Sequence, residues 1–201
     1  MQDLFTKGID PKGNVRSKGT HKFVLKNNLE VPSSWDVDIL DNLASVTKLA
    51  GYEYSKYFDY SIGGEIIALR ALNIKNVEIV LDNIQTIPKQ VSDFLVRSKI
   101  NKNDILITYI GAYIGDVLLI SENDKYHLAP NIAKITSGKK ISPNFLELLL
   151  RSNLVQTQMK NLVATTATPS LTMGQIRKLI LAYPKDENEQ TKIVESVMSA
   201  K

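Results

Sequence analysis

The stretch DILITYIGAYIGDVLLI, residues 104–120, contains two apolar, β-branched runs separated by Gly111, Ala112 and Tyr113. β-Branched residues favour extended strands, and a glycine between two such runs favours a turn. The stretch therefore predicts a β-hairpin with a somewhat irregular turn, and with it a sheet at the centre of the fold.

Shorter runs on both sides of this hairpin predict further strands. Residues 35–39 alternate apolar and acidic side chains, which is typical of a half-buried strand. Four more strands are predicted from the apolar runs at 65–70, 76–81, 132–135 and 179–183. Residues 47–64 are rich in aromatic side chains and are predicted to form a loop.

Helical signals gather in the C-terminal third. A Ser-Pro pair at 142–143 predicts a helix that continues to about residue 163. The pattern at 172–175 is a capping box for a short helix, and a last helix is expected from residue 186 onward. Residues 87–98 have helical character as well.

These elements predict an α+β fold with a mixed or antiparallel, β-rich domain and peripheral helices, followed by the start of a long coiled-coil-type helix. Residues 1–30 are basic and poor in apolar side chains, so we expect an extended, exposed arm. Residues 31–184 are expected to form the domain, and residues 185–201 to begin the long helix.

The last helix carries an apolar stripe made of Ile193, Val194, Val197 and Met198. An amphipathic helix of about four turns does not bury such a stripe alone. Three possibilities are open: the stripe packs on its own domain, it packs against a partner chain, or it belongs to a longer helix pair.

The composition excludes several classes of function. The 201 residues are 43% hydrophobic, carry a net charge of +4 and include no cysteine, which removes disulfides, thiolate nucleophiles and cysteine zinc sites. No apolar run is long enough to span a membrane and the N-terminus does not resemble a secretory signal, so we expect a cytoplasmic protein without membrane association. The mild positive charge permits a nucleic-acid partner without requiring one.

Catalytic patterns are scarce. His21 lies in the basic arm and His127 at a strand start, where a surface or packed histidine is expected. The chain has no P-loop and no His-based metal motif, so neither a cofactor nor a metal ion is expected. One enzyme hypothesis uses Asp104 and Asp116 of the hairpin as a carboxylate pair, although solvation at strand ends explains these acids more simply.

Seven segments follow one another in an order that resembles the specificity (S) subunit of type I restriction–modification systems. They are VPSSWDV (31–37), GYEYSKYF (51–58), GEIIALRALNI (64–74), NDILITYIGAYIG (103–115), HLAPNI (127–132), TATPSLTMGQI (166–176) and YPKDENEQTKI (183–193). The resemblance runs from about residue 4 to the end of the chain.

The resemblance implies a non-catalytic DNA-recognition subunit. In this family, each target-recognition domain reads one half of a split double-stranded DNA sequence, and two long helices separate two such domains. Methyltransferase (M) subunits bind the cofactor and flip the target adenine, and the restriction (R) subunit cuts. Residues 4–17 look like the lead into the second recognition domain, and the pair at 189–190 looks like the start of the second long helix. The chain is thus expected to be one recognition domain, either a fragment or a half-subunit that pairs with a second.

We expect DNA-facing residues among the loop aromatics, hydroxyls and bases, because Arg and Asn pair with base edges while Lys, Thr, Ser and Tyr hold phosphates. The predicted set is Lys48, Tyr52, Tyr54, Lys56, Arg70, Asn73, Lys75, Tyr109, Tyr113, Thr165, Thr166, Thr168 and Ser170. Arg70 and Asn73 are the candidates for base contact, with a structural salt bridge as the alternative for Arg70. The alternative function is a protein-interaction adaptor that docks through the last helix.

Overall fold

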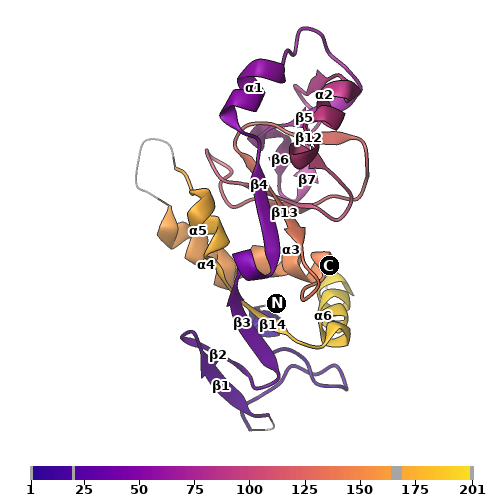
Figure 1. The fold of residues 1–201 in the computed structure, drawn as a ribbon. Helices are drawn as coiled ribbons and strands as arrows, with labels where there is room; N and C mark the ends of the chain where they lie inside the picture. Colours follow the sequence, from indigo (N-terminus) through magenta and orange to yellow (C-terminus); the bar gives the residue numbers. More distant parts are fainter. Residues whose placement is uncertain (1, 20, 164–168, 200–201) are drawn as a thin grey trace.

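A computed structural model describes residues 2–19, 21–163 and 169–199 (Figure 1). Its strands are β1 (Phe23–Lys26), β2 (Leu29–Pro32), β3 (Trp35–Ile39), β4 (Ala44–Lys48), β5 (Ile66–Leu69), β6 (Ile74–Lys75), β7 (Glu78–Ile79), β8 (Gln85–Ile87), β9 (Lys99–Ile100), β10 (Ile105–Thr108), β11 (Val117–Leu119), β12 (Tyr126–Leu128), β13 (Ile132–Ser137) and β14 (Ile180–Pro184). Its α-helices are α1 (Gly51–Tyr57), α2 (Lys89–Phe94), α3 (Pro143–Arg151), α4 (Asn153–Leu162), α5 (Met173–Arg177) and α6 (Glu187–Ser199). Short 3-10 turns are η1 (Gln2–Phe5), η2 (Leu40–Asn42), η3 (Ala71–Asn73) and η4 (Val96–Ser98).

The central sheet has the order β11-β10-β13-β4 and is antiparallel throughout. The predicted hairpin is confirmed, since Ile105 pairs with Leu119 and Ile107 with Val117. Successive side chains of a strand point to opposite faces. Ile105 and Ile107 therefore enter one hydrophobic core, and Leu106 enters another.

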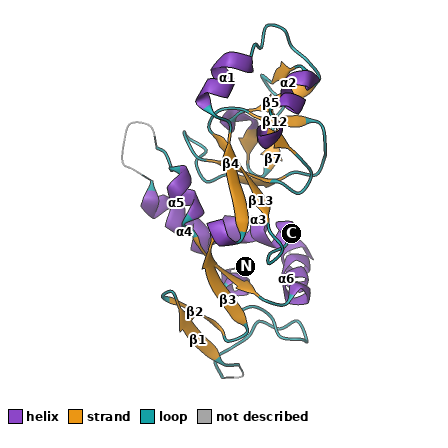
Figure 2. Ribbon diagram, viewed as in Figure 1, coloured by secondary structure: helices purple, strands orange, loops and turns teal. Residues whose placement is uncertain are grey.

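The upper core includes Leu69, Ile100, Leu106 and Leu128. It lies below a second sheet of order β8-β5-β12-β9, in which β5 and β12 are parallel and the other pairs are antiparallel. Helices α1 and α2 lie at this end of the molecule (Figure 2). This sheet combines parallel and antiparallel pairs. The prediction of an α+β fold with a mixed or antiparallel, β-rich domain is therefore confirmed.

The lower core includes Trp35 and Phe145, both fully buried. Strand β3 pairs antiparallel with β14, as the alternating pattern at 35–39 and the apolar run at 179–183 predict. Helix α3 crosses between the central sheet and this lower pair, and α6 lies beside it (Figure 1).

Residues 51–57 form helix α1 where the sequence predicts a loop. The backbone N–H of Ala50 donates a 3.1 Å hydrogen bond to Glu53 Oε2, which stabilises the helix start in place of a capping side chain. Tyr54 and Phe58 lie one turn apart, with ring centroids 5.4 Å apart, and both pack against the upper core. The aromatic residues therefore have helical spacing.

Two other elements are shorter than predicted. The helix expected over 142–163 breaks at Ser152, whose extended backbone separates α3 from α4 and whose hydroxyl donates to the Leu149 carbonyl at 2.6 Å. The strand expected at 76–81 is only the two-residue β7, because Asn76 and Val77 both have positive φ and form a tight turn back onto β6.

The N-terminal segment is not an exposed arm throughout, which corrects that expectation. Phe5 and Ile9 are buried in the lower core, and the Phe5 and Phe145 ring centroids lie 5.9 Å apart. The two apolar residues are separated by Thr6, Lys7 and Gly8, which are polar or small, so the composition of the segment hides them.

The apolar stripe of α6 packs mainly on its own domain and not against a partner helix. Ile193 and Val197 are buried in the lower core, and Val194 packs at its edge. Met198 alone of the four is largely exposed, at 59%. The prediction of a partner-helix surface is therefore wrong for Ile193 and Val197, because α3 covers them.

Candidate nucleic-acid interface

A groove at the upper end of the molecule gathers several of the predicted DNA-facing residues. It has a volume of about 360 Å³ and lies between α1, the end of β5, the β10–β11 turn and the segment after β12. Its lining residues are Tyr54, Arg70, Ala71, Leu72, Ile110, Gly111, Ala112, Tyr113, Pro130 and Asn131. Tyr54, Arg70 and Tyr113 thus converge from three separate segments.

Arg70 is held in place without a carboxylate. Its Nη2 donates to the Asn83 carbonyl, and its backbone N–H donates to Asn73 Oδ1 at 3.2 Å. Among the described residues Arg70 forms no ion pair, so the predicted structural salt bridge is not formed. No acid therefore neutralises the guanidinium among the described residues; Nε is buried, and the remaining N–H groups of Nη1 and Nη2 are donors for a ligand in the groove.

Two lysines rest on tyrosine rings beside the groove. Lys75 Nζ lies 5.2 Å from the centroid of the Tyr113 ring, and Lys48 Nζ lies 5.8 Å from that of Tyr109. The Tyr109 ring is buried, and burial raises the pKa of its hydroxyl. Tyr113 is 38% exposed. The Tyr109 ring is therefore packed inside the fold, whereas the Tyr113 ring remains accessible.

Lys48 and Lys75, the two lysines beside the groove, differ from other lysines in having no acidic partner. Within the described ranges neither Lys48 nor Lys75 has a carboxylate partner, whereas Lys89, Lys99 and Lys125 each pair with an acid. An aromatic face attracts a cation without neutralising it. The edge of the groove therefore keeps positive charge that anions can reach.

Tyr52 and Lys56 lie outside the groove. Tyr52 is 70% exposed and lines a different cavity with Tyr57 and Phe94. Residues two positions apart on a helix point about 200° apart, so Tyr52 and Tyr54 occupy opposite faces of α1. Lys56 Nζ lies 5.2 Å from the Tyr57 ring centroid.

Asn73 is buried and structural, so its prediction as a base contact is wrong. Its Nδ2 donates to the carbonyls of Val80 and Asp82 at 3.0 and 3.3 Å, and its Oδ1 accepts the Arg70 N–H. The amide thereby secures the loop after β7 to the end of β5, and because the side chain is fully buried with both N–H groups in use, it does not reach DNA.

The predicted hydroxyl loop is described only in part. Thr165, Thr166 and Thr168 lie outside the described residues. Ser170 forms an antiparallel bridge with Ile110 in the groove wall, and Gly111 N–H donates to the Pro169 carbonyl at 3.1 Å. The C-terminal end of this loop is therefore joined to the groove.

Asn131 is a groove residue that the sequence reasoning missed. It is exposed, has a φ of +74°, and its carbonyl accepts the Tyr109 N–H at 3.1 Å. Asparagine tolerates the left-handed region better than most residues, so the Pro130–Asn131 pair is a turn signal that could have identified this position.

The carboxylate pair of the enzyme hypothesis is not brought together. Asp104 is followed by Ile105, and Asp116 lies opposite Thr108, so the two acids lie at opposite ends of the hairpin, about 13 Å apart along the strand. Asp104 is buried and accepts from Thr136 Oγ1, whereas burial raises the pKa of Asp116.

Other chemistry is not assembled in the part of the chain that the structure describes. His127 is buried, its ring nitrogens lie 2.9 and 3.4 Å from the Leu128 and Leu95 carbonyls, and burial lowers its pKa, as for a packed histidine. No cluster of three or more His, Cys, Asp or Glu side chains suited to a metal ion occurs among the described residues. None of their helices has the length and hydrophobicity needed to span a membrane.

Comparison with known proteins gives consistent matches. The profile of the family described as "Type I restriction modification DNA specificity domain" matches residues 32–198. The type I restriction enzyme EcoBI specificity subunit of Escherichia coli is 30% identical over 180 residues, which is 89% of this chain and 37% of that protein. The chain thus spans little more than a third of that relative.

Solved structures share the fold at low sequence identity. The S subunit of a type I restriction-modification system from M. genitalium has a TM-score of 0.57 and 17% identity, over 90% of this chain and 41% of that one. The HsdS subunit from Thermoanaerobacter tengcongensis has a TM-score of 0.60 and 14% identity, over 88% and 39%. Because the family profile covers residues 32–198, the chain belongs to the family of type I restriction-modification DNA specificity domains.

Proposed function

We propose that this chain reads one half of a bipartite double-stranded DNA target, as the specificity subunit or half of the specificity subunit of a type I restriction–modification system. In this proposal residues 31–184 are the recognition domain, and residues 185–201 begin the helix that spaces it from a second one. The chain has no catalytic role. Methyltransferase subunits modify the adenine, and a restriction subunit cuts.

The groove is the observation that carries this proposal. Tyr54, Arg70 and Tyr113 line it, and Lys48 and Lys75 stand beside it without acidic partners among the described residues. Phosphate contacts supply most of the affinity of a DNA-binding surface, and they need cations that are not already neutralised. The surface therefore has both a stacking or hydrogen-bonding interior and a charged rim.

Within the groove we assign different roles to the cations. Arg70 is anchored through one nitrogen to the Asn83 carbonyl, which leaves donors in the planar fork that pairs with the O6 and N7 atoms of guanine. Lys48 and Lys75 are single point charges on flexible stems and suit phosphates. Arg70 thus contributes sequence preference, and the lysines contribute affinity.

Selection of bound duplexes from a random pool tests the proposal. The chain should enrich a motif of a few base pairs, and its affinity should fall steeply between about 50 and 200 mM salt. The double variant Lys48→Gln/Lys75→Gln should lose most binding. The matched control Lys89→Gln/Lys125→Gln should keep it, because those lysines pair with acids. An unenriched pool, or equal loss in both double variants, would contradict the proposal.

A further inference from the structure

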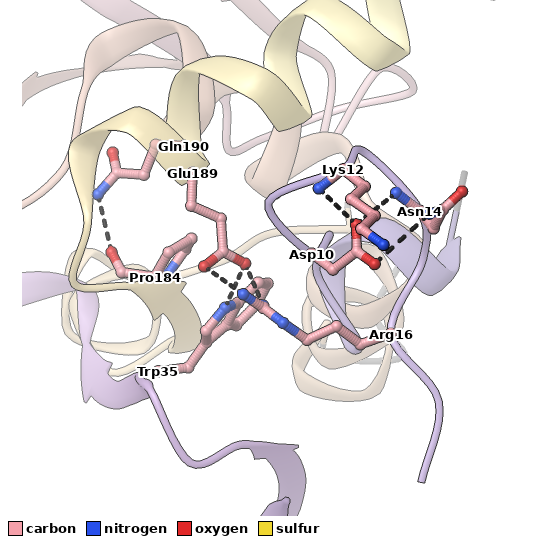
Figure 3. A network of polar contacts seen from close by, with 8 residues as sticks. All are labelled: Asp10, Lys12, Asn14, Arg16, Trp35, Pro184, Glu189 and Gln190. Atoms are coloured by element: carbon pink, nitrogen blue, oxygen red, sulfur yellow. Dashed lines mark hydrogen bonds and ion pairs between the residues drawn. The ribbon is translucent and has the colours of Figure 1, made fainter. Parts of the chain in front are cut away.

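The first turn of α6 is tied to the N-terminal part of the chain by a buried carboxylate (Figure 3). Glu189 Oε1 accepts a 2.9 Å hydrogen bond from the Trp35 indole N–H. Both carboxylate oxygens bind the Arg16 guanidinium, with 2.9 Å between Nη2 and Oε2. Glu189 and Trp35 are buried, and Arg16 is nearly so. One side chain therefore joins α6, the start of β3 and the segment before β1.

Gln190, the next residue, fastens the first turn of α6 to the segment before α3 and to the end of β14. Gln190 is fully buried, and its Nε2 donates to the Lys140 and Pro184 carbonyls, both at 3.0 Å. Its Oε1 accepts a 2.8 Å hydrogen bond from the backbone N–H of Ser142, and Ser142 is the N-cap residue of α3. Glu189 and Gln190 thus fasten α6 to both the N-terminal segment and α3.

The N-terminal segment has a glycine at the point where it passes Glu189 and Trp35; the contacts of Glu189 and Gln190 with the rest of the chain are called the joint below. Gly8 has a φ of +64°, and a Cβ there would lie 2.5 Å from Glu189 Oε1 and 2.7 Å from Trp35 Cζ2. The turn that follows is closed by the Asp10 carboxylate, which accepts the N–H groups of Lys12 and Asn14 at 2.8 and 2.9 Å (Figure 3). The segment therefore passes close to the Glu189 carboxylate at Gly8, turns at residues 10–14, and brings Arg16 back to the same carboxylate.

The chemistry of the joint favours orientation over stability. Replacing a buried ion pair by apolar side chains is often neutral or stabilising, because two charges must be desolvated. Elsewhere along α6 the apolar Ile193 and Val197 pack in the lower core, and apolar contacts are less directional than hydrogen bonds. The buried hydrogen bonds of Glu189 and Gln190 are directional, so they constrain how α6 is rotated and tilted.

We propose that Glu189 is a positioning residue that fixes the direction in which α6 leaves the recognition domain. This inference rests on the proposed function, in which α6 begins the spacer helix. A domain that recognises one half-site must keep a fixed orientation relative to the spacer helix, because that helix separates it from the domain that recognises the other half-site. Arg16 and the Pro11 carbonyl also contact α6, so the turn before β1 is fastened to the same helix.

Spin-label distances test this directly. The chain has no cysteine, so Ser45→Cys on β4 and Met198→Cys on α6, both exposed, label only these sites. Pulsed EPR should give one narrow distance distribution. In Arg16→Met/Glu189→Gln, which removes both charges, we expect a melting temperature near that of the parent but a broadened or shifted distribution. The control Glu195→Gln changes an exposed acid of the same helix and should leave the distribution unchanged.

An unchanged distribution in the double variant would overturn the inference. So would a double variant that fails to fold, because Glu189 would then be a residue of general stability. Duplex binding by the groove should stay within the error of the parent. If the parent itself binds no duplex, the proposed function fails, whereas the distance measurement still decides whether Glu189 fixes α6.

Discussion

The ammonium of Lys75 stands over the Tyr113 ring, although the two residues come from β6 and from the turn between β10 and β11. The contact brings a cation to the groove edge and holds it by a ring rather than by an acid. A cation–π contact at an exposed site contributes about 0.5–1 kcal/mol. Such a contact orients the lysine and leaves its charge for phosphate.

Lys75→Gln should reduce the salt dependence of DNA binding. Each phosphate contact contributes about −0.9 to the slope of log K against log salt, so the slope should fall by about 1. The matched control is Lys125→Gln, because Lys125 also lies over a ring but pairs with Glu122 at 2.8 Å. Fluorescence anisotropy with a labelled duplex over a salt series measures both, and equal slopes in the two variants would remove Lys75 from the interface.

Arg70→Ala should weaken discrimination at one base position by about 1–3 kcal/mol, because a bidentate contact to guanine is lost. Overall affinity for other sequences should change less. Competition among duplexes that differ at single positions measures this, with Arg97→Ala as control, since Arg97 pairs with Glu53 at 3.2 Å and lines the other cavity. A uniform loss across all duplexes would place Arg70 on a phosphate instead.

His127 should make the protein less stable in mild acid. Burial lowers its pKa in the folded state below the ordinary value of 6.5. Below about pH 6.5 the unfolded chain binds a proton that the folded chain does not, so the free energy of unfolding falls as the pH falls. Urea unfolding at pH 7.5 and 5.5 should show a smaller pH effect in His127→Gln than in the parent.

Gly8→Ala should destabilise the protein more than Gly13→Ala. Both glycines have positive φ, which costs a side chain roughly 1–2 kcal/mol. A Cβ at Gly8 would also lie 2.5 Å from Glu189 Oε1, whereas nothing lies within 4 Å of one at Gly13. The difference in melting temperature between the two variants isolates the contact, and identical melting curves would show that the joint has room for a methyl group.

Elements with local signals could be predicted from the sequence. The hairpin at 104–120 and the strand at 35–39 follow from patterns of neighbouring residues. The capping box is equally local: Thr172 N–H donates to Gln175 Oε1 at 2.8 Å and Gln175 N–H to Thr172 Oγ1 at 3.1 Å. Each of these needs no information from distant parts of the chain.

The failures depend on residues far away in sequence or on unusual caps. Asn73 is buried because Val80 and Asp82 turn back over it, and their carbonyls give no sequence signal. The α6 stripe is covered by α3, which only the tertiary fold brings near. Helix α1 begins after Ala50, a residue without a capping side chain. For the groove, chemistry suggested Tyr54, Arg70 and Tyr113, but their convergence could not be inferred from spacing.

Strand β10 sends Ile105 and Ile107 to one side and Leu106 to the other, and this has a consequence for how the molecule melts. If the half that contains the groove separated from the half that contains α6, one buried face of β10 would become exposed to solvent. The two halves therefore share one cooperative transition, and a calorimetric scan should contain a single peak.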